Sequence, residues 1–399
     1  MLVGTGSAPI GLLPAYARDF RLSPLQVTLV AAASTFGVMV AVPLLGRLSD
    51  FVGRKPVMLP GLLLGVASIG AYLAADGFEL LLAARILSGV AVAVLTGAAT
   101  AALTELAASG GGDTRRAATH AATAGIVGFA AGPVFGGIFV QYGPWPLRLV
   151  YAVSLVLLLP ALVGVALLPE TMTSRRPVLL RPQLGVPRSG LPTFAVAALV
   201  ATCCFGAASF FQSLGGVFVV RLLKVHDLFV ASLVVASFLG SSTVGQIRFR
   251  ALTIRRQTVG GLTLLPAGTA LVVAGLLVES LPLFVAGAVV GGLGQGIAYI
   301  GGQSLVELAA PPERRGELFS LYLVVVYVTG GAGAITLGAV ANGVGLHRAA
   351  VGYSIVLAAV TVATAAIASR ATSRARAVSP ARAPAGSAVS APPSGRRRP

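Results

Sequence analysis

A short polar turn, GRLSDFVGRK at residues 46–55, joins two apolar segments of this chain, 25–45 and 56–75. Each segment is close to the length of about 20 apolar residues that a helix needs to cross the hydrocarbon core of a membrane. The glycines of the turn allow helices to approach closely and permit positive φ, and the turn ends on the basic pair Arg54 and Lys55. This arrangement predicts a hairpin of two transmembrane helices.

The same alternation of long apolar segments and short polar turns extends over most of the chain. The segments are too long and too continuous to be strands of a membrane barrel, which are shorter and alternate. We therefore predict an all-α membrane protein with twelve transmembrane helices in two pseudo-symmetric six-helix bundles. The predicted segments are 1–17, 25–45, 56–75, 79–103, 117–141, 147–168, 191–219, 228–247, 257–278, 281–306, 317–341 and 349–369.

The overall composition fits a chain that lies mostly in lipid. Of its 399 residues 56% are hydrophobic and 10% are charged, whereas soluble domains carry roughly 25% charged residues. The 50 glycines suit membrane helices, which pack closely through small residues. The first segment is the weakest, because it contains Pro9, Pro14 and several glycines and has no basic flank. We expect a start at Met1 to truncate this helix, with the native start upstream.

The basic residues indicate how the chain is oriented. When the loops are assigned alternately to two sides, the side without the 46–55 turn holds few of them. The positive-inside rule then places that turn, the central loop and both termini in the cytoplasm of a cell-membrane protein. Orientation and anionic lipid therefore account for the net charge of +17 without a nucleic-acid partner. The basic residues of the other side are Arg18, Arg21, Arg148, Arg221, Lys224 and Arg348.

The chain divides into two halves that repeat one another. We predict an N-terminal bundle at 1–168, a cytoplasmic central loop at 169–190, a C-terminal bundle at 191–370 and a disordered basic tail at 371–399. The tetrapeptide Glu-Leu-Ala-Ala occurs at residues 105–108 and again at 307–310, and each copy is followed by a pair of arginines. Parallel repeats of this kind are typical of transporters that work by alternating access around a site at the middle of the membrane.

Three motifs resemble those of the Major Facilitator Superfamily, in particular its drug:proton antiporter branch. The 46–55 turn resembles the signature loop of that family. A stretch in the fourth predicted helix resembles its Arg-x-x-x-Gly motif, and one in the fifth resembles its antiporter motif in part, because Thr119 stands where a further glycine would fall. The matching residues are Gly46, Asp50, Gly53, Arg54 and Lys55; Arg85 and Gly89; and Gly128, Gly132, Pro133, Gly136 and Gly137.

The resemblance implies that Asp50 forms part of a cytoplasmic latch near the start of the eleventh helix, around Gly316 and Glu317. A carboxylate is favoured at a helix N-terminus. We expect the latch to include Asp50, Arg54, Glu105, Arg115, Glu307 and Arg314. The equivalent loop of the second half has no acid where Asp50 would correspond, so the latch is expected on one side only.

Polar and aromatic residues within the apolar segments are candidates for a substrate cavity. Gln212, Gln295, Tyr299, Gln303 and Tyr327 interrupt otherwise apolar helices, as does Tyr322, and Phe205, Phe210 and Phe211 offer an aromatic surface. A largely apolar cavity suits lipophilic or mildly cationic compounds better than sugars. Each of these residues is also compatible with ordinary helix packing.

The resemblance implies a monomeric transporter that exports a small amphipathic molecule or drug in exchange for protons. The alternatives are a metabolite uptake symporter or uniporter on the same fold, and a non-transporting membrane receptor or scaffold. No acid lies deep in any segment, so the residues themselves show no proton relay. Motifs for an intramembrane enzyme, a metal or a nucleotide are absent from the sequence, so we expect no enzymatic activity and no cofactor.

We predict that Asp50→Asn abolishes transport while leaving membrane insertion intact, because the substitution removes the charge that the latch requires. Transport rates and membrane yield of the variant check this. An unchanged rate would remove Asp50 from the mechanism.

Overall fold

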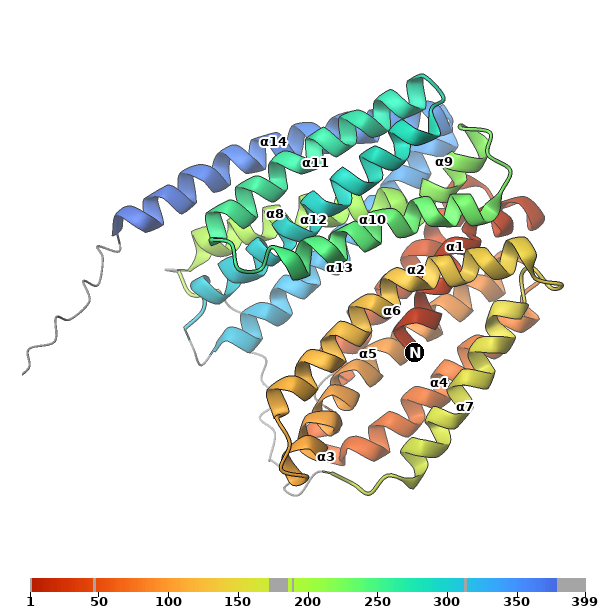
Figure 1. Ribbon diagram of the computed structural model, residues 1–399, viewed down its shortest axis with the longest axis vertical. Helices are drawn as coiled ribbons and strands as arrows, with labels where there is room; N and C mark the ends of the chain where they lie inside the picture. Colours follow the sequence, from red (N-terminus) through yellow and green to blue (C-terminus); the bar gives the residue numbers. More distant parts are fainter. Residues whose placement is uncertain (1, 46–47, 172–185, 189, 312–313, 379–399) are drawn as a thin grey trace, which may run out of the picture.

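The computed structural model describes residues 2–45, 48–171, 186–188, 190–311 and 314–378; at residues 2–5, 43–44, 50 and 372–378 it describes the backbone alone. The first half of the chain forms one bundle of antiparallel helices (Figure 1). Its elements are α1 (Leu2–Asp19), α2 (Pro24–Leu45), the short α3 (Ser49–Val52), α4 (Arg54–Ala74), α5 (Phe78–Ser109), α6 (Thr114–Tyr142) and α7 (Leu149–Leu167).

The second half forms a matching bundle. Its first span is interrupted by a π-helical turn, Phe211–Gly215, between α8 (Leu191–Phe210) and α9 (Gly216–Arg221). The other elements are α10 (Leu228–Arg248), α11 (Ile254–Leu277), α12 (Leu281–Ala309), α13 (Arg315–Val344) and α14 (Leu346–Val378). Thus α14 continues past residue 370, and the rest of the predicted tail lies outside the described residues, as does most of the central loop.

Eleven spans within the described residues are long and apolar enough to cross a membrane. The helix α1 is not among them, and it completes the predicted set of twelve. Its side chains are shielded from lipid, since Leu12, Leu13 and Tyr16 are almost completely buried against other helices. A helix surrounded by protein does not need the hydropathy of a lipid-facing helix, which explains why this segment is weak in the sequence. The predicted fold class is confirmed.

The two bundles touch at one end and diverge at the other, so that Figure 1 shows a V. We call the divergent end the basic end; among the described residues it carries the segments 48–53, 110–113, 249–253 and 310–311. The opposite end, with the loops 20–23, 75–77, 143–148, 222–227 and 278–280, is the closed end.

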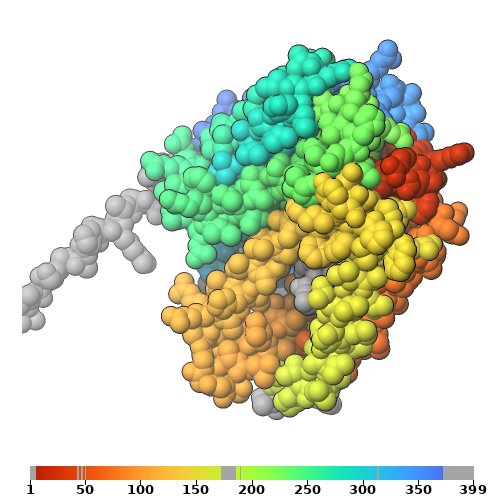
Figure 2. All heavy atoms as spheres, turned by 45° about the vertical axis from the view of Figure 1, so that its right-hand side comes forward, coloured from red at the N-terminus to blue at the C-terminus, as the bar shows by residue number. Residues whose placement is uncertain are grey.

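Close packing of small residues joins the bundles near the closed end. A side chain at Gly338 of α13 would collide with Thr28 of α2, and one at Gly137 of α6 would collide with Ser232 of α10. Ser232 Oγ also donates a hydrogen bond of 3.0 Å to the carbonyl of Gly11. Figure 2 shows α10 (green) lying directly against the N-terminal half.

We predict that cysteines placed in the two regions differ in reactivity. In purified protein, Thr96→Cys should react readily with a water-soluble maleimide, because Thr96 is exposed in the gap between the bundles. Thr28→Cys should remain unreactive, since Thr28 is fully buried at the closed end. The native Cys203 and Cys204 are also fully buried and contribute little background. Faster labelling at position 28 would contradict the arrangement of the bundles.

Candidate functional site

A cavity of about 660 Å³ lies between the two bundles. Its volume is within the range of roughly 300–1,000 Å³ that is typical of small-molecule sites. Helices α1, α2, α5 and α6 line it from one half, and α8, the π-helical turn, α10, α12 and α13 line it from the other. Both repeats therefore contribute to one site, which any rocking of one bundle against the other would reshape.

The structure places most of the polar residues that we expected in the cavity along its wall. Gln212, Gln295, Tyr299 and Tyr327 line it, all from the C-terminal half. Gln303 lies one turn beyond Tyr299 on α12 and is not among the lining residues.

The expected aromatic residues divide between the cavity and the interior of the bundle. Phe205 lines the cavity, with its ring edge-on to Tyr299 at 5.4 Å. Phe211 instead stacks on Phe238 at 4.4 Å, and Tyr322 is fully buried. Sequence periodicity could not separate these cases, because neither α8, which leads into the π-helical turn, nor α13, which carries Tyr322, has a distinct apolar face.

A hydrogen-bonded group fixes the amide of Gln295. Ser242 Oγ donates to Gln295 Oε1, and Gln246 Nε2 donates to Ser242 Oγ at 3.2 Å. All three residues line the cavity. Ser242 and Gln246 are not predicted from the sequence, because a serine and a glutamine near a helix end resemble ordinary surface residues.

The helical span that carries Gln212 is locally distorted at this residue. The π-helical turn Phe211–Gly215 contains Gln212 and Ser213, and both line the cavity. Turns of this kind are rare and occur frequently at functional sites. The apolar run of the sequence gave no signal of this turn.

Arg85 is the charged side chain of the cavity wall within the described residues. Only 2% of its surface is exposed. Its guanidinium donates to three backbone carbonyls: Nη1 to Gly6 at 2.8 Å, Nε to Val30 at 3.2 Å and Nη2 to Ala31 at 3.5 Å. Arg85 therefore faces the interior and joins α5 to α1 and α2, rather than extending toward the membrane surface.

Gly89, one turn after Arg85, brings these helices together. A side chain at Gly89 would collide with the backbone of Ser34 in α2. The antiporter-like motif of α6 packs in a similar way, since Gly136 lies against the carbonyl of Ala8 and Pro133 lies against Gly11. Gly132 and Gly137 are buried in α6, while Gly128 is half-buried. These motif residues position α1 and α10 beside the cavity.

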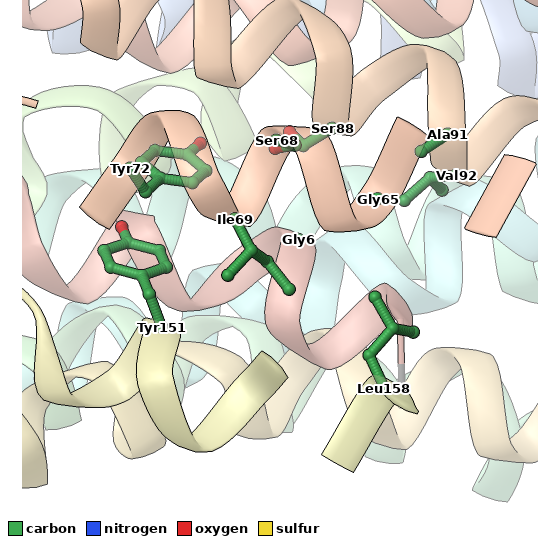
Figure 3. Close-up of a pocket in the computed structure, with 10 residues that line it drawn as sticks. All are labelled: Gly6, Gly65, Ser68, Ile69, Tyr72, Ser88, Ala91, Val92, Tyr151 and Leu158. Atoms are coloured by element: carbon green, nitrogen blue, oxygen red, sulfur yellow. The ribbon is translucent and has the colours of Figure 1, made fainter. Parts of the chain in front are cut away.

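A smaller pocket of about 20 Å³ lies inside the N-terminal bundle, and its mostly apolar wall includes the polar residues Ser68, Tyr72, Ser88 and Tyr151 (Figure 3). Tyr72 stacks on Tyr151 with ring centroids 4.3 Å apart, and the Tyr151 and Tyr16 hydroxyls are 2.7 Å apart. Ser88 lines both this pocket and the central cavity. The pocket has room for about one water molecule and is too small for a substrate.

A cluster at the basic end organises the signature turn. Arg54 Nη2 forms an ion pair of 2.8 Å with Glu105, and Thr171 Oγ1 donates to the same carboxylate at 2.6 Å. Glu170 accepts from the backbone N–H groups of Arg54 and Lys55 at 2.9 and 3.1 Å. Because these N–H groups begin α4 and have no partner within the helix, Glu170 serves as a helix cap supplied from the end of α7.

The structure describes only part of the predicted latch. Gly46 and the side chain of Asp50 lie outside the described residues. Gly53 has φ +117°, a conformation that favours glycine. Arg115 is exposed, at the start of a helix capped by Asp113.

The latch residues of the second half are arranged differently. Arg314 pairs with Glu317 at 3.0 Å, which raises the pKa of its guanidinium through their hydrogen bond. Glu307 is exposed and forms no ion pair with a described residue. Glu105 of the first half thus forms an ion pair with Arg54, whereas Glu307, the corresponding acid of the second half, forms none with a described residue.

The chain belongs to the Major Facilitator Superfamily, whose family model matches residues 1–278. This is a family of transporters, not of enzymes. Among curated proteins, the chain is similar to the putative multidrug resistance protein MdtD of two Klebsiella pneumoniae strains, with 28% and 27% identity over 157 residues. Each match covers 37% of this chain and only 33% of the relative.

Solved structures share the fold over nearly the whole chain. A crystal structure of the nucleoside transporter NupG has a TM-score of 0.72 at 14% identity, and covers 92% of this chain and 96% of that one. A bacterial homolog of the human lysosomal transporter Spinster, described as inward-facing and unoccupied, has a TM-score of 0.70 at 14% identity. It covers 94% of this chain and 95% of the homolog. At these identities the likeness shows the fold alone.

We predict that Glu170→Ala destabilises the N-terminal bundle by about 1 kcal/mol, the typical cost of losing a helix cap. Thermal unfolding of the purified protein measures this. Glu307→Ala is the matched control, because it removes an exposed acid that pairs with no described residue and should change stability by less than about 0.5 kcal/mol. Equal effects of the two substitutions would contradict the capping role.

Proposed function

We propose that this protein is a secondary transporter that exports a small amphipathic molecule or drug in exchange for protons by alternating access. The observation that carries the proposal is the cavity between the two bundles, which meet at the closed end and diverge at the basic end. A site built jointly by two repeats is what alternating access requires. The partial likeness to proteins named for multidrug resistance supports export.

The direction of access follows from the distribution of charge. The proposal places the protein in the cell membrane with the basic end and both termini in the cytoplasm, because cytoplasmic loops carry an excess of arginine and lysine. The cavity would then load its cargo from the cytoplasm, as an exporter must. We propose that a single chain suffices, since one chain supplies both bundles.

Switching the access requires the closed-end interface to separate. That interface consists of small-residue packing and a few neutral hydrogen bonds, such as the 2.9 Å bond from the Leu228 N–H to Gln141 Oε1. Hydrogen bonds of this kind contribute about 1 kcal/mol each. The interface can therefore hold one state without preventing the other. The stronger Arg54–Glu105 pair lies within one bundle and can persist in both states.

Proton coupling normally requires a titratable group in or near the cavity. No acid or histidine lines the cavity among the described residues. Asp19 is at the closed end and pairs with Arg18 at 2.6 Å. Proton exchange therefore rests on the resemblance to drug:proton antiporters, and Asp50 is the remaining acid that the motif places in the mechanism.

We predict that cells producing the protein tolerate a subset of amphipathic toxic compounds better than cells without it. A susceptibility screen identifies these compounds, and proteoliposomes with an imposed pH gradient then test their movement. Acceleration by a proton gradient directed against the cargo supports antiport. Acceleration in the same direction as the protons supports an uptake symporter instead. Indifference to the gradient supports a uniporter, and failure to move any compound supports a receptor or scaffold.

A further inference from the structure

The charge of the cavity points to a narrower class of cargo, an inference that rests on the proposed function. Arg85 is the charged residue among those that line the cavity within the described ranges. The other polar groups of the wall are neutral hydroxyls and amides, including Ser34, Thr35 and Gln212. The interior of the cavity therefore carries a positive charge. This charge disfavours the mildly cationic compounds that the sequence alone led us to expect as cargo.

No acid among the described side chains balances the positive charge of Arg85. Its three hydrogen bonds all go to neutral backbone carbonyls, and no ion pair with Arg85 is formed within the described residues. Burial of an ionised side chain without a counter-charge is costly. An anion in the cavity would recover part of this cost, whereas a cation would increase it.

The positions of the residues indicate how such an anion would lie. Arg85 and Gln212 are both two to three helical turns from the closed ends of their helices, so they mark the inner end of the cavity. Apolar residues such as Val38, Ile126, Phe129 and Leu323 line the rest of it. A molecule with an anionic head and an apolar body would match both regions.

The basic end, from which the cavity is reached, is also positively charged. Arg248, Arg250, Arg255 and Arg256 are exposed at the basic end, and none forms an ion pair with a described acid. A surface of one charge raises the local concentration of ligands of the opposite charge. These arginines also fit the positive-inside rule, so the argument depends on Arg85 rather than on them.

We propose that the cavity selects amphipathic organic anions, with Arg85 as the charge that distinguishes them from cations. Direct contact between the guanidinium and the anion is not required, because Coulomb attraction acts over several ångströms wherever the protein lowers the effective dielectric constant below that of water. The Gln212 amide, which also lines the cavity, provides a neutral hydrogen-bond donor for an anionic head.

The test compares two probes that share an aromatic body and carry permanent charges of opposite sign. 2-Naphthalenesulfonate and 2-naphthyltrimethylammonium are both poorly permeable through lipid, so their counterflow exchange in proteoliposomes reports on the protein. We expect the sulfonate to exchange at least about tenfold faster, the factor that corresponds to about 1.4 kcal/mol. Equal exchange, faster exchange of the ammonium, or exchange of neither probe would overturn the proposal.

Substitution of Thr35 tests the charge without altering Arg85. Thr35 lines the cavity and lies one turn from Ala31, whose carbonyl accepts from Arg85. Thr35→Asp adds a carboxylate to the same cavity wall and should abolish the preference for the sulfonate. Thr35→Asn, the neutral control of nearly equal size, should preserve it. Loss of the preference in both variants, or in neither, would contradict a role for charge.

Two variants of Arg85 complete the experiment. Arg85→Lys should retain the preference and Arg85→Gln should lose it, provided that thermal unfolding shows both to be folded; otherwise the Thr35 pair decides. Movement of compounds from the susceptibility screen tests the proposed transport separately. If those compounds move but the sulfonate is not preferred, the transporter function stands and the anion selectivity fails.

Discussion

Hydrocarbon offers no hydrogen-bond partner to a peptide group, so a backbone that crosses it must satisfy its own N–H and C=O groups. In this chain the described spans do so as helices, including α1, which is weak in hydropathy but buried by its neighbours. The same constraint leaves little room for irregular backbone at membrane depth. The π-helical turn at Phe211–Gly215 is the type of irregularity that remains possible, because it lies inside the protein and borders the cavity.

Once the helices are formed, their association depends on surfaces rather than on hydrophobicity, since lipid tails are as apolar as the helices. Small residues provide these surfaces. Gly89 admits the backbone of α2, Gly136 admits that of α1, and Gly338 admits Thr28 across the two bundles. The first two contacts hold one bundle together, whereas the third belongs to an interface that the proposed alternating access would have to separate. Similar packing thus stabilises a rigid bundle where it lies within one half, and forms a separable contact where it lies between the two halves.

The two repeats have diverged most clearly in their polar groups. The N-terminal half contains the ion pair of Arg54 and the buried charge of Arg85, and the C-terminal half contributes the amides and phenols of the cavity. The cavity therefore has one charged wall and one neutral polar wall. An asymmetric site of this kind can orient a cargo that has one charged end, which a symmetric site could not.

The sequence by itself determined the membrane class, the helical spans and the family, because hydropathy and the spacing of Gly53, Arg54 and Lys55 are local properties of the chain. It also singled out Arg85 as part of a family-like motif within an apolar segment. Only the tertiary structure decided that Gln212 and Gln295 reach the cavity while Phe211 and Tyr322 do not, and that Glu170 caps α4. The reason is that an apolar helix does not encode which of its faces meets a cavity; the packing of distant helices around it sets that rotation.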